Sequence, residues 1–184
     1  MTPPPLASPE LRAAVLAHGA VLTALNTAIK DADRVIVERL DAHPDGEVFR
    51  SLPRAGTINA AQILAEWGEA REVFGHPDVI AALAGISPVT KSSGRQRGVA
   101  FRWACNKRLR VAITTFTANS HFSSPWTADI YNQARAAAKD HPHATRILAR
   151  AWVHVIWRCW QSWTLYDPAL HGAAHRLTQR ASAA

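Results

Sequence analysis

The sequence ATRILARAWVHVIWRCWQSWTL spans residues 144–165 and contains four of the seven tryptophans of this 184-residue chain. Its apolar residues recur three or four positions apart, which is the spacing of one face of an α-helix: Leu148, Trp152, Val155, Ile156, Cys159 and Trp163. Packing in a core explains such a stripe better than stacking on nucleic-acid bases. The stretch therefore predicts a core helix over residues 144–165 in a domain that is nearly all α-helical.

Capping residues predict further helices before it. Thr57 is expected to cap a helix over residues 58–67 that Gly68 closes. The triplet His76-Pro77-Asp78 opens a short helix that ends at Gly85. Two more helices are expected, one from an Asn106 cap to about residue 119 and one from residues 123–126 to about residue 139.

The part between these helices reads as extended. Pro88 disfavours a helical conformation at Ser87, so residues 86–90 are expected to be extended. Residues 91–94 form a predicted turn. Val99, Phe101 and Trp103 alternate with other residues, which predicts a short strand over residues 98–103.

A long helix is expected at the other end of the chain, over residues 9–43. Its apolar or small residues follow an average spacing of 3.5, which is typical of a coiled coil: Leu11, Val15, His18, Leu22, Leu25, Ile29, Ala32 and Ile36. It is interpreted as a connector that joins two copies of the chain or two domains; the alternative is a helix packed on its own domain. The predicted organisation is a disordered leader (1–8), this helix, a compact domain (50–170) and a frayed tail (171–184).

Composition limits the class of protein. The start of the chain lacks the basic and apolar regions of a signal peptide, and no run approaches the 18 or so uncharged residues of a membrane span. Two cysteines, Cys105 and Cys159, exclude a disulfide framework. A soluble, cytoplasmic protein without a membrane partner is expected.

Positive charge is concentrated in one part of the chain. Residues 1–50 carry a net charge of −2 and residues 51–184 one of +9. Residues 91–110 contain seven basic side chains and no acidic one, namely Lys91, Arg95, Arg97, Arg102, Lys107, Arg108 and Arg110. This concentration predicts a surface for nucleic-acid phosphates; a solvated basic loop is the alternative.

Three groups of residues in this half could contact phosphate. Lys107, Arg108 and Arg110 follow the Asn106 cap, where exposed helix N–H groups favour an anion; in the alternative the side chains fan outward. Ser92-Ser93-Gly94 is a turn among arginines, in which a hydroxyl could attack phosphorus, although such turns are common in other roles. Residues 53–61 resemble a helix-hairpin-helix, whose turn would offer Arg54, Gly56 and Thr57 to DNA.

Metal binding is not predicted. His141 and His143 lack companion ligands at fixed spacing, and the other histidines considered, His121, His171 and His175, are scattered. Asp129, Asp140 and Asp167 lie far apart and form no carboxylate cluster for magnesium. No cofactor is therefore expected in this chain.

An ordered series of motifs resembles the C-terminal, serine-containing domain of IS110/IS116/IS902 family transposases. The motifs are AGISPVT at 84–90, SSG at 92–94 and FRWACNKRLR at 101–110. HPHA at 141–144, RILARAW at 146–152 and YDP at 166–168 resemble actinobacterial members. The resemblance covers about residues 50–170, and the long helix before it resembles the family's coiled-coil connector.

This resemblance implies a DNA recombinase that moves an insertion sequence under the direction of a structured bridge RNA. The family serine that precedes the glycine forms a phosphoserine link to DNA, and it corresponds to Ser93, with Ser92 as the fallback. Arg95, Arg97 and Arg102 are candidates for stabilising the phosphoryl charge, and Lys91 and Gly94 for contacting phosphate. Arg54 stands where the family's Leu-Pro-Gly-x-Gly hairpin has its first glycine.

The resemblance also implies a second domain. Family members carry an N-terminal RuvC-like domain whose Asp-Glu-Asp-Asp set binds Mg²⁺ and completes the active site with the serine domain. This chain starts close to the connector helix, so a truncated, remnant or split transposase is expected, one that binds nucleic acid but does not recombine it alone. The alternatives are a non-catalytic, dimerising nucleic-acid module and, less favoured, a protein adaptor with exposed tryptophans.

Overall fold

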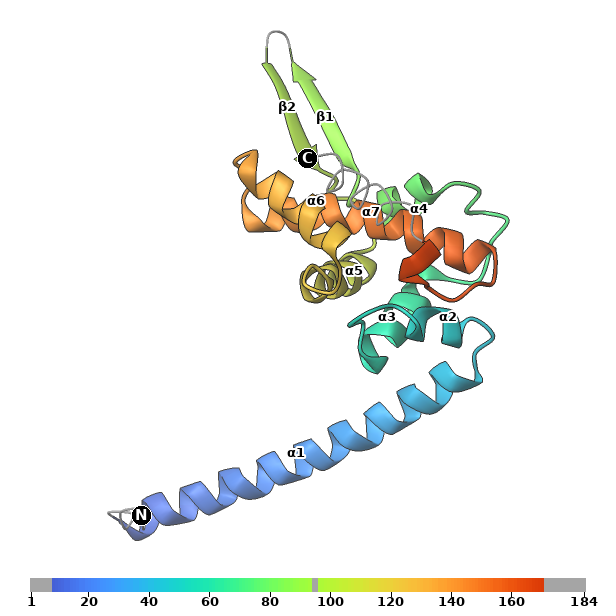
Figure 1. The fold of residues 1–184 in the computed structure, drawn as a ribbon. Coiled ribbons are helices and arrows are strands. Elements are labelled where there is room, and N and C mark those ends of the chain that lie inside the picture. Colours follow the sequence, from blue (N-terminus) through green and yellow to red (C-terminus); the bar gives the residue numbers. More distant parts are fainter. Residues whose placement is uncertain (1–7, 94–95, 171–184) are drawn as a thin grey trace. The chain divides into compact units, whose positions relative to one another are not determined.

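The computed structural model describes residues 8–93 and 96–170, and the predicted mainly α-helical fold is confirmed (Figure 1). The predicted leader over residues 1–7 and the tail over 171–184 lie outside the described residues. In chain order the elements are α1 Pro9–Ala42, α2 Gly46–Arg50, α3 Thr57–Trp67, α4 Pro77–Leu83, β1 Pro88–Ser93, β2 Gln96–Phe101, α5 Lys107–Ser120, α6 Pro125–Ala136, α7 His141–Gln161 and the 3-10 turn η1 Pro168–Leu170.

The chain divides into two compact units, with the boundary between Arg39 and Leu40. The first unit consists mainly of α1, and the predicted long helix is confirmed. Its large apolar side chains are exposed, which leaves an uncovered stripe along the helix: Leu11, Val15, Leu22, Leu25, Ile29 and Ile36.

α1 also corrects one expectation from composition. The helix is long and apolar enough, by length and composition alone, to cross a membrane. Residues 13–29 contain no Asp, Glu, Lys or Arg, so an uncharged run of nearly the required length does exist. His18 and Gly19 interrupt the apolar pattern of this run, so the run is not evident from the sequence.

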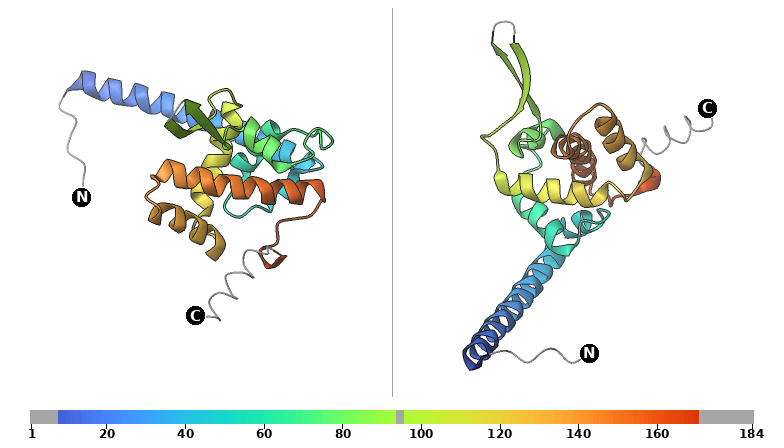
Figure 2. Two further views of the ribbon diagram at one scale, coloured as in Figure 1. Left: turned by 90° about the horizontal axis from the view of Figure 1, so that it is seen from above. Right: turned by 90° about the vertical axis from the view of Figure 1, so that its left-hand side faces the viewer.

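The second unit is built around α7, which packs against α4, α5 and α6 and touches α2 (Figure 2). Its inward face is fully buried at Leu148, Trp152, Ile156 and Trp160. The Trp152 ring meets Phe116 of α5 at 4.9 Å and Trp126 of α6 at 4.7 Å between centroids, both edge-to-face. Burial of these rings confirms a core helix and argues against an exposed tryptophan patch. Trp163 was wrongly included in the predicted stripe, since it is 57% exposed and lies beyond the end of α7.

Two helices end earlier than predicted, and for the same reason. α7 stops at Gln161 instead of about residue 165, and α6 at Ala136 instead of about residue 139. The residues that close them, Trp163 (φ 55°) and Ala138 (φ 56°), adopt the left-handed conformation. Glycine normally occupies this position, so the sequence offered no stop at either place.

The start of α3 is also placed differently. Gly56, and not Thr57, is the N-cap residue, with φ 68° and its carbonyl accepting the first helical bond from the Ala60 amide. This conformation is unfavourable for threonine and available to glycine. Two other predicted starts are confirmed, since His76 caps α4 and Asn106 caps α5 through their side chains. α7 instead begins at His141, three residues before the predicted start, because the Asp140 side chain caps it. The five-residue helix α2 was not predicted.

Candidate nucleic-acid interface

The predicted serine turn lies at the far end of a two-stranded antiparallel hairpin. Pro88 pairs with Phe101 and Ser93 with Gln96, so residues 94–95 alone connect the strands. Ser92 and Ser93 are therefore the last residues of β1, which corrects their assignment to the turn. Gly94 and Arg95, both assigned to this site, lie outside the described residues.

The hairpin carries the serines away from the helical core. β1 and β2 pair with each other and extend from the helices of this unit (Figures 1 and 2). Lys91 lies opposite Gly98, and Ser92 opposite Arg97. Over residues 90–101 the structure describes the backbone. The hairpin backbone therefore places the predicted nucleophile beside basic positions of both strands.

The second group, at the start of α5, is arranged as a capped helix terminus. The Asn106 side-chain oxygen accepts bonds from the amides of Arg108 and Leu109, each at 3.0 Å. These are two of the backbone donors that the sequence analysis assigned to an anion, and the cap already satisfies them. What remains toward solvent is the exposed Lys107 side chain and the Arg108 side chain, which is 83% exposed.

An acidic residue that sequence reasoning missed lies at this helix start. Glu66 of α3 accepts a bond from Asn106 Nδ2 at 2.8 Å and lies 3.6 Å from Arg108 Nη1. The Arg108 side chain is 83% exposed and that of Glu66 20%, and a long pair whose cation is in solvent contributes about 1 kcal/mol at most. Arg108 can therefore exchange Glu66 for a phosphate at little loss, whereas Asn106 is held in its capping role.

Arg110 was predicted to bind phosphate, and the structure adds a structural role for it. Its guanidinium donates to the carbonyls of Ala84 (3.3 Å) and Arg102 and to Cys105 Sγ (2.6 Å). Gly85 lies against the same group: it has φ +64°, and a Cβ there would come within 2.9 Å of the Arg102 carbonyl oxygen. Arg110 thereby fastens residues 102–105 to the end of α4.

The third predicted group, between α2 and α3, is a turn with two left-handed residues. Arg54 has φ 59° and Gly56 φ 68°, and both are exposed. Thr57, half-buried, is the first residue of α3. Two helices joined by this turn fit the predicted helix-hairpin-helix. The Arg54 side chain is accessible just before α3.

α7 brings further basic side chains to the foot of the hairpin. Arg146 and Arg150 line a small cavity of about 140 Å³ together with His143, Ile86 and Pro88. Burial, and then the nearby charge of Arg110, lower the pKa of Arg146 below its ordinary value. Arg146 and Arg150 are four residues apart, so the sequence places them on one face of the helix. The sequence did not reveal that this face lies close to β1.

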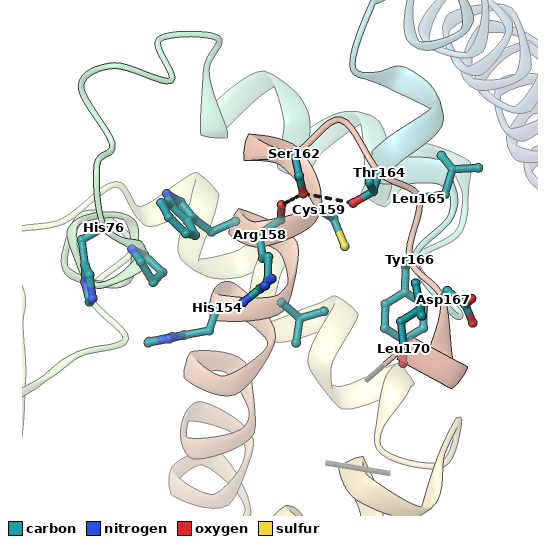
Figure 3. Close-up of a pocket in the computed structure, with 13 residues that line it drawn as sticks. His76, His154, Arg158, Cys159, Ser162, Thr164, Leu165, Tyr166, Asp167 and Leu170 are labelled. Carbon is teal, nitrogen blue, oxygen red and sulfur yellow. Dashed lines mark hydrogen bonds between the residues drawn. The ribbon is translucent and has the colours of Figure 1, made fainter. Parts of the chain in front are cut away.

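A larger pocket, of about 790 Å³, lies at the end of α7 (Figure 3). His76, His154, Arg158, Cys159 and Tyr166 contribute to its wall (Figure 3). Burial raises the pKa of both the Cys159 thiol and the Tyr166 hydroxyl. A raised pKa disfavours the anionic, nucleophilic form of each group, so this pocket offers no activated nucleophile from these two side chains.

Metal ligands do not gather in the described part of the chain. Within residues 8–93 and 96–170, no three His, Cys, Asp or Glu side chains come together in a way that could hold a metal ion.

Comparison with known proteins assigns a family to this arrangement. Residues 46–132 match the family model described as Transposase IS116/IS110/IS902 family. The chain is 34% identical, over 90% of its length, to the 42 kDa protein of insertion element IS900 from Mycobacterium paratuberculosis, and covers 42% of that protein. It is 32% identical, over 84% of its length, to the 44.8 kDa protein of insertion element IS116 from Streptomyces clavuligerus, and covers 38% of it.

A third relative is the 43.6 kDa protein of insertion element IS110 from Streptomyces coelicolor, 29% identical over 79% of this chain and 36% of that protein. The chain thus spans about two fifths of the length of the curated relatives it matches. The family match includes the hairpin, α3 and the start of α5, which are the three elements that carry the predicted phosphate contacts.

Proposed function

Because this chain carries a domain of the IS116/IS110/IS902 transposase family, we propose that it acts in DNA transposition. It binds DNA phosphates through the hairpin β1–β2 and the start of α5, and it supplies Ser93, with Ser92 as the fallback, as the nucleophile. Its place of action is the cytoplasm, at the nucleoid, where the DNA lies. The alternative function is a catalytically inactive module that binds nucleic acid.

One observation carries the proposal: the basic stretch is continuous in sequence and extends along a projecting element. Between Asp78 and Asp129 the chain contains no acidic residue. All seven basic residues of residues 91–110 fall in this interval, on the hairpin, the connecting segment and α5. Positive charge of this density attracts polyanions, and nucleic acid is the polyanion that a transposase domain meets.

The proposed serine step conserves bonds. The Ser93 hydroxyl oxygen forms a bond to phosphorus while the bond from phosphorus to a deoxyribose oxygen breaks. The serine proton passes to a general base and from there to the leaving oxygen. One phosphodiester replaces another, so the strand can be rejoined without a nucleotide cofactor. Arg95, Arg97 and Arg102 are the candidates that would stabilise the charge on the non-bridging oxygens.

Mg²⁺ and a guide RNA belong to the proposal as groups supplied from elsewhere. The family resemblance implies Mg²⁺ on an acidic RuvC-like domain, and the described residues of this chain offer no such set of ligands. No step assigned to this chain therefore passes through a metal ion. A bridge RNA would present the same phosphate chemistry to the basic stretch as DNA does.

We also propose self-association through α1, which its exposed apolar stripe supports. Leu22 and Leu25 are 61% and 54% exposed, and burial of a leucine contributes about 1.5–3 kcal/mol. We expect Leu22→Glu with Leu25→Glu to weaken a homodimer about a hundredfold or more. Sedimentation equilibrium measures this, with the exchange Asp31→Glu as a control on the polar face. A monomeric wild-type chain would contradict the proposal, and capture by lipid vesicles in its place would point to a membrane role for α1.

Phosphate binding is tested by its salt dependence. For duplex DNA, each phosphate that a basic side chain neutralises makes the slope of log Kobs against log salt concentration more negative by about 0.9. Lys107→Gln with Arg108→Gln is expected to flatten the slope by about 2. Lys30→Gln with Arg39→Gln removes the same charge from exposed positions of α1 and should leave it within about 0.5 of wild type. Arg110 is left intact because it fastens the fold.

These binding measurements, together with a search for a protein–DNA adduct, distinguish the catalytic domain from the inactive nucleic-acid-binding module. Salt-dependent binding without any protein–DNA adduct would favour the inactive module. Binding that is insensitive to salt, or no binding, would contradict both, because each of them relies on the phosphate surface.

A further inference from the structure

Trp103 differs from the other described tryptophans in its exposure. Trp67, Trp126, Trp152 and Trp160 are buried, and Trp157 is half-buried. Trp163 is 57% exposed, but its ring covers the Arg71 guanidinium at 3.6 Å. Trp103 is 81% exposed and forms no hydrogen bond or ring contact with another side chain that the structure describes. An exposed indole of this kind offers a free π-face on which a flat partner can stack.

The segment that carries Trp103 is fixed to the fold on both sides. Arg110 donates to the Arg102 carbonyl and to Cys105 Sγ, and the Asn106 amide donates to the Leu83 carbonyl at 2.8 Å. Gly85 allows this close approach, since a side chain there would collide with Cys105 and Arg102. The ring therefore projects from an ordered backbone, so little conformational entropy would be lost when it makes a contact.

A groove of about 590 Å³ adjoins the segment. Its walls are the α4 residues Val79, Ala82 and Leu83 on one side and Arg102, Ala104 and Cys105 on the other. Asp78 also lines the groove, and hydrogen bonds from Arg150 lower the pKa of its carboxyl and hold it as a paired anion. The groove is thus largely apolar, bordered by the exposed Arg102 and followed in the chain by Lys107 and Arg108.

An exposed aromatic ring with cations near it in the chain is the combination with which proteins hold unpaired nucleic-acid bases. The cations attract the nucleic-acid backbone. The ring can stack only on a base whose face is free, and in an intact duplex the base faces are stacked on one another. We propose that Trp103 stacks on an unpaired DNA base at the foot of the hairpin, next to the groove between α4 and residues 102–105. The inference rests on the proposed binding of nucleic acid and adds a preference for DNA that is locally opened.

The test compares unpaired with paired DNA. The full chain, as wild type or Trp103→Ala, is titrated into a fluorescein-labelled oligonucleotide of mixed sequence, either alone or annealed to its complement, and binding is followed by anisotropy. Trp103→Ala is expected to weaken binding of the single strand about 5- to 150-fold and of the duplex less than about twofold. Trp103→Phe keeps a ring and should restore most of the loss. Phe122→Ala, which removes another ring that is 76% exposed, should change neither affinity.

Each other outcome overturns the inference in a recognisable way. Equal loss on both DNAs, or no loss on either, would show that Trp103 does not stack on a base while DNA binding itself stands. Dependence on Trp103 only for an RNA strand of the same sequence would overturn the assignment to DNA. A wild-type chain that binds neither DNA would contradict the proposed function together with this inference.

A control shows that Trp103→Ala is folded: its thermal unfolding should match that of the wild type.

Discussion

Asp45→Ala is expected to destabilise the domain by about 3–5 kcal/mol. The Asp45 side chain is 2% exposed, pairs with Arg71 and accepts a bond from Trp160 Nε1 at 3.0 Å. Arg71 also donates to the Trp160 carbonyl at 3.1 Å, and its guanidinium lies between the rings of Trp160 and Trp163. Removing the carboxylate leaves a mostly buried cation and a buried indole N–H without their partner.

Urea unfolding followed by tryptophan fluorescence measures this effect. The matched control is Asp41→Ala, because Asp41 pairs with Arg50 in a bridge whose side chains are 48% and 42% exposed. Loss of such a surface pair is expected to change the free energy of unfolding by less than about 1 kcal/mol. If both substitutions have the same small effect, Asp45 does not anchor α7 to the start of the domain as described.

Local signals predicted many of the elements correctly. Pro77 and Pro125 at first helical positions and Asn106 as a cap act within one helical turn, so the sequence reveals them directly. The ends of α6 and α7 were wrong because Ala138 and Trp163 adopt a conformation that their residue types rarely do. α2 was missed since five residues give no readable period.

The candidate site was predictable only where its contacts are close in sequence. The basic stretch of residues 91–110 and the serines are visible as composition and motif. The contact of Glu66 with Asn106 spans 40 residues, and that of Asp45 with Trp160 spans 115. Such pairs depend on how helices pack, which periodicity does not specify. For the same reason the role of Arg110 in holding residues 102–105 came from the structure.

Loss of a covalent protein–DNA adduct is the largest expected effect. If Ser93 is the nucleophile, Ser93→Ala removes the only atom that bonds to phosphorus, and adduct formation should fall to below about one thousandth of wild type. Ser92→Ala should retain the adduct, because Ser92 is one residue further from the turn in β1. Ser162→Ala is the matched control, since Ser162 is exposed at the end of α7, away from the basic stretch.

The most direct measurement is mass spectrometry of that adduct. The chain is incubated with Mg²⁺, labelled DNA containing the ends of the insertion element, and a full-length relative whose own serine is replaced, and the protein is then digested. The account predicts a nucleotide linked to the peptide that contains Ser93. An adduct that survives replacement of Ser92 and Ser93 together, or no adduct while the unaltered relative forms one, would contradict it.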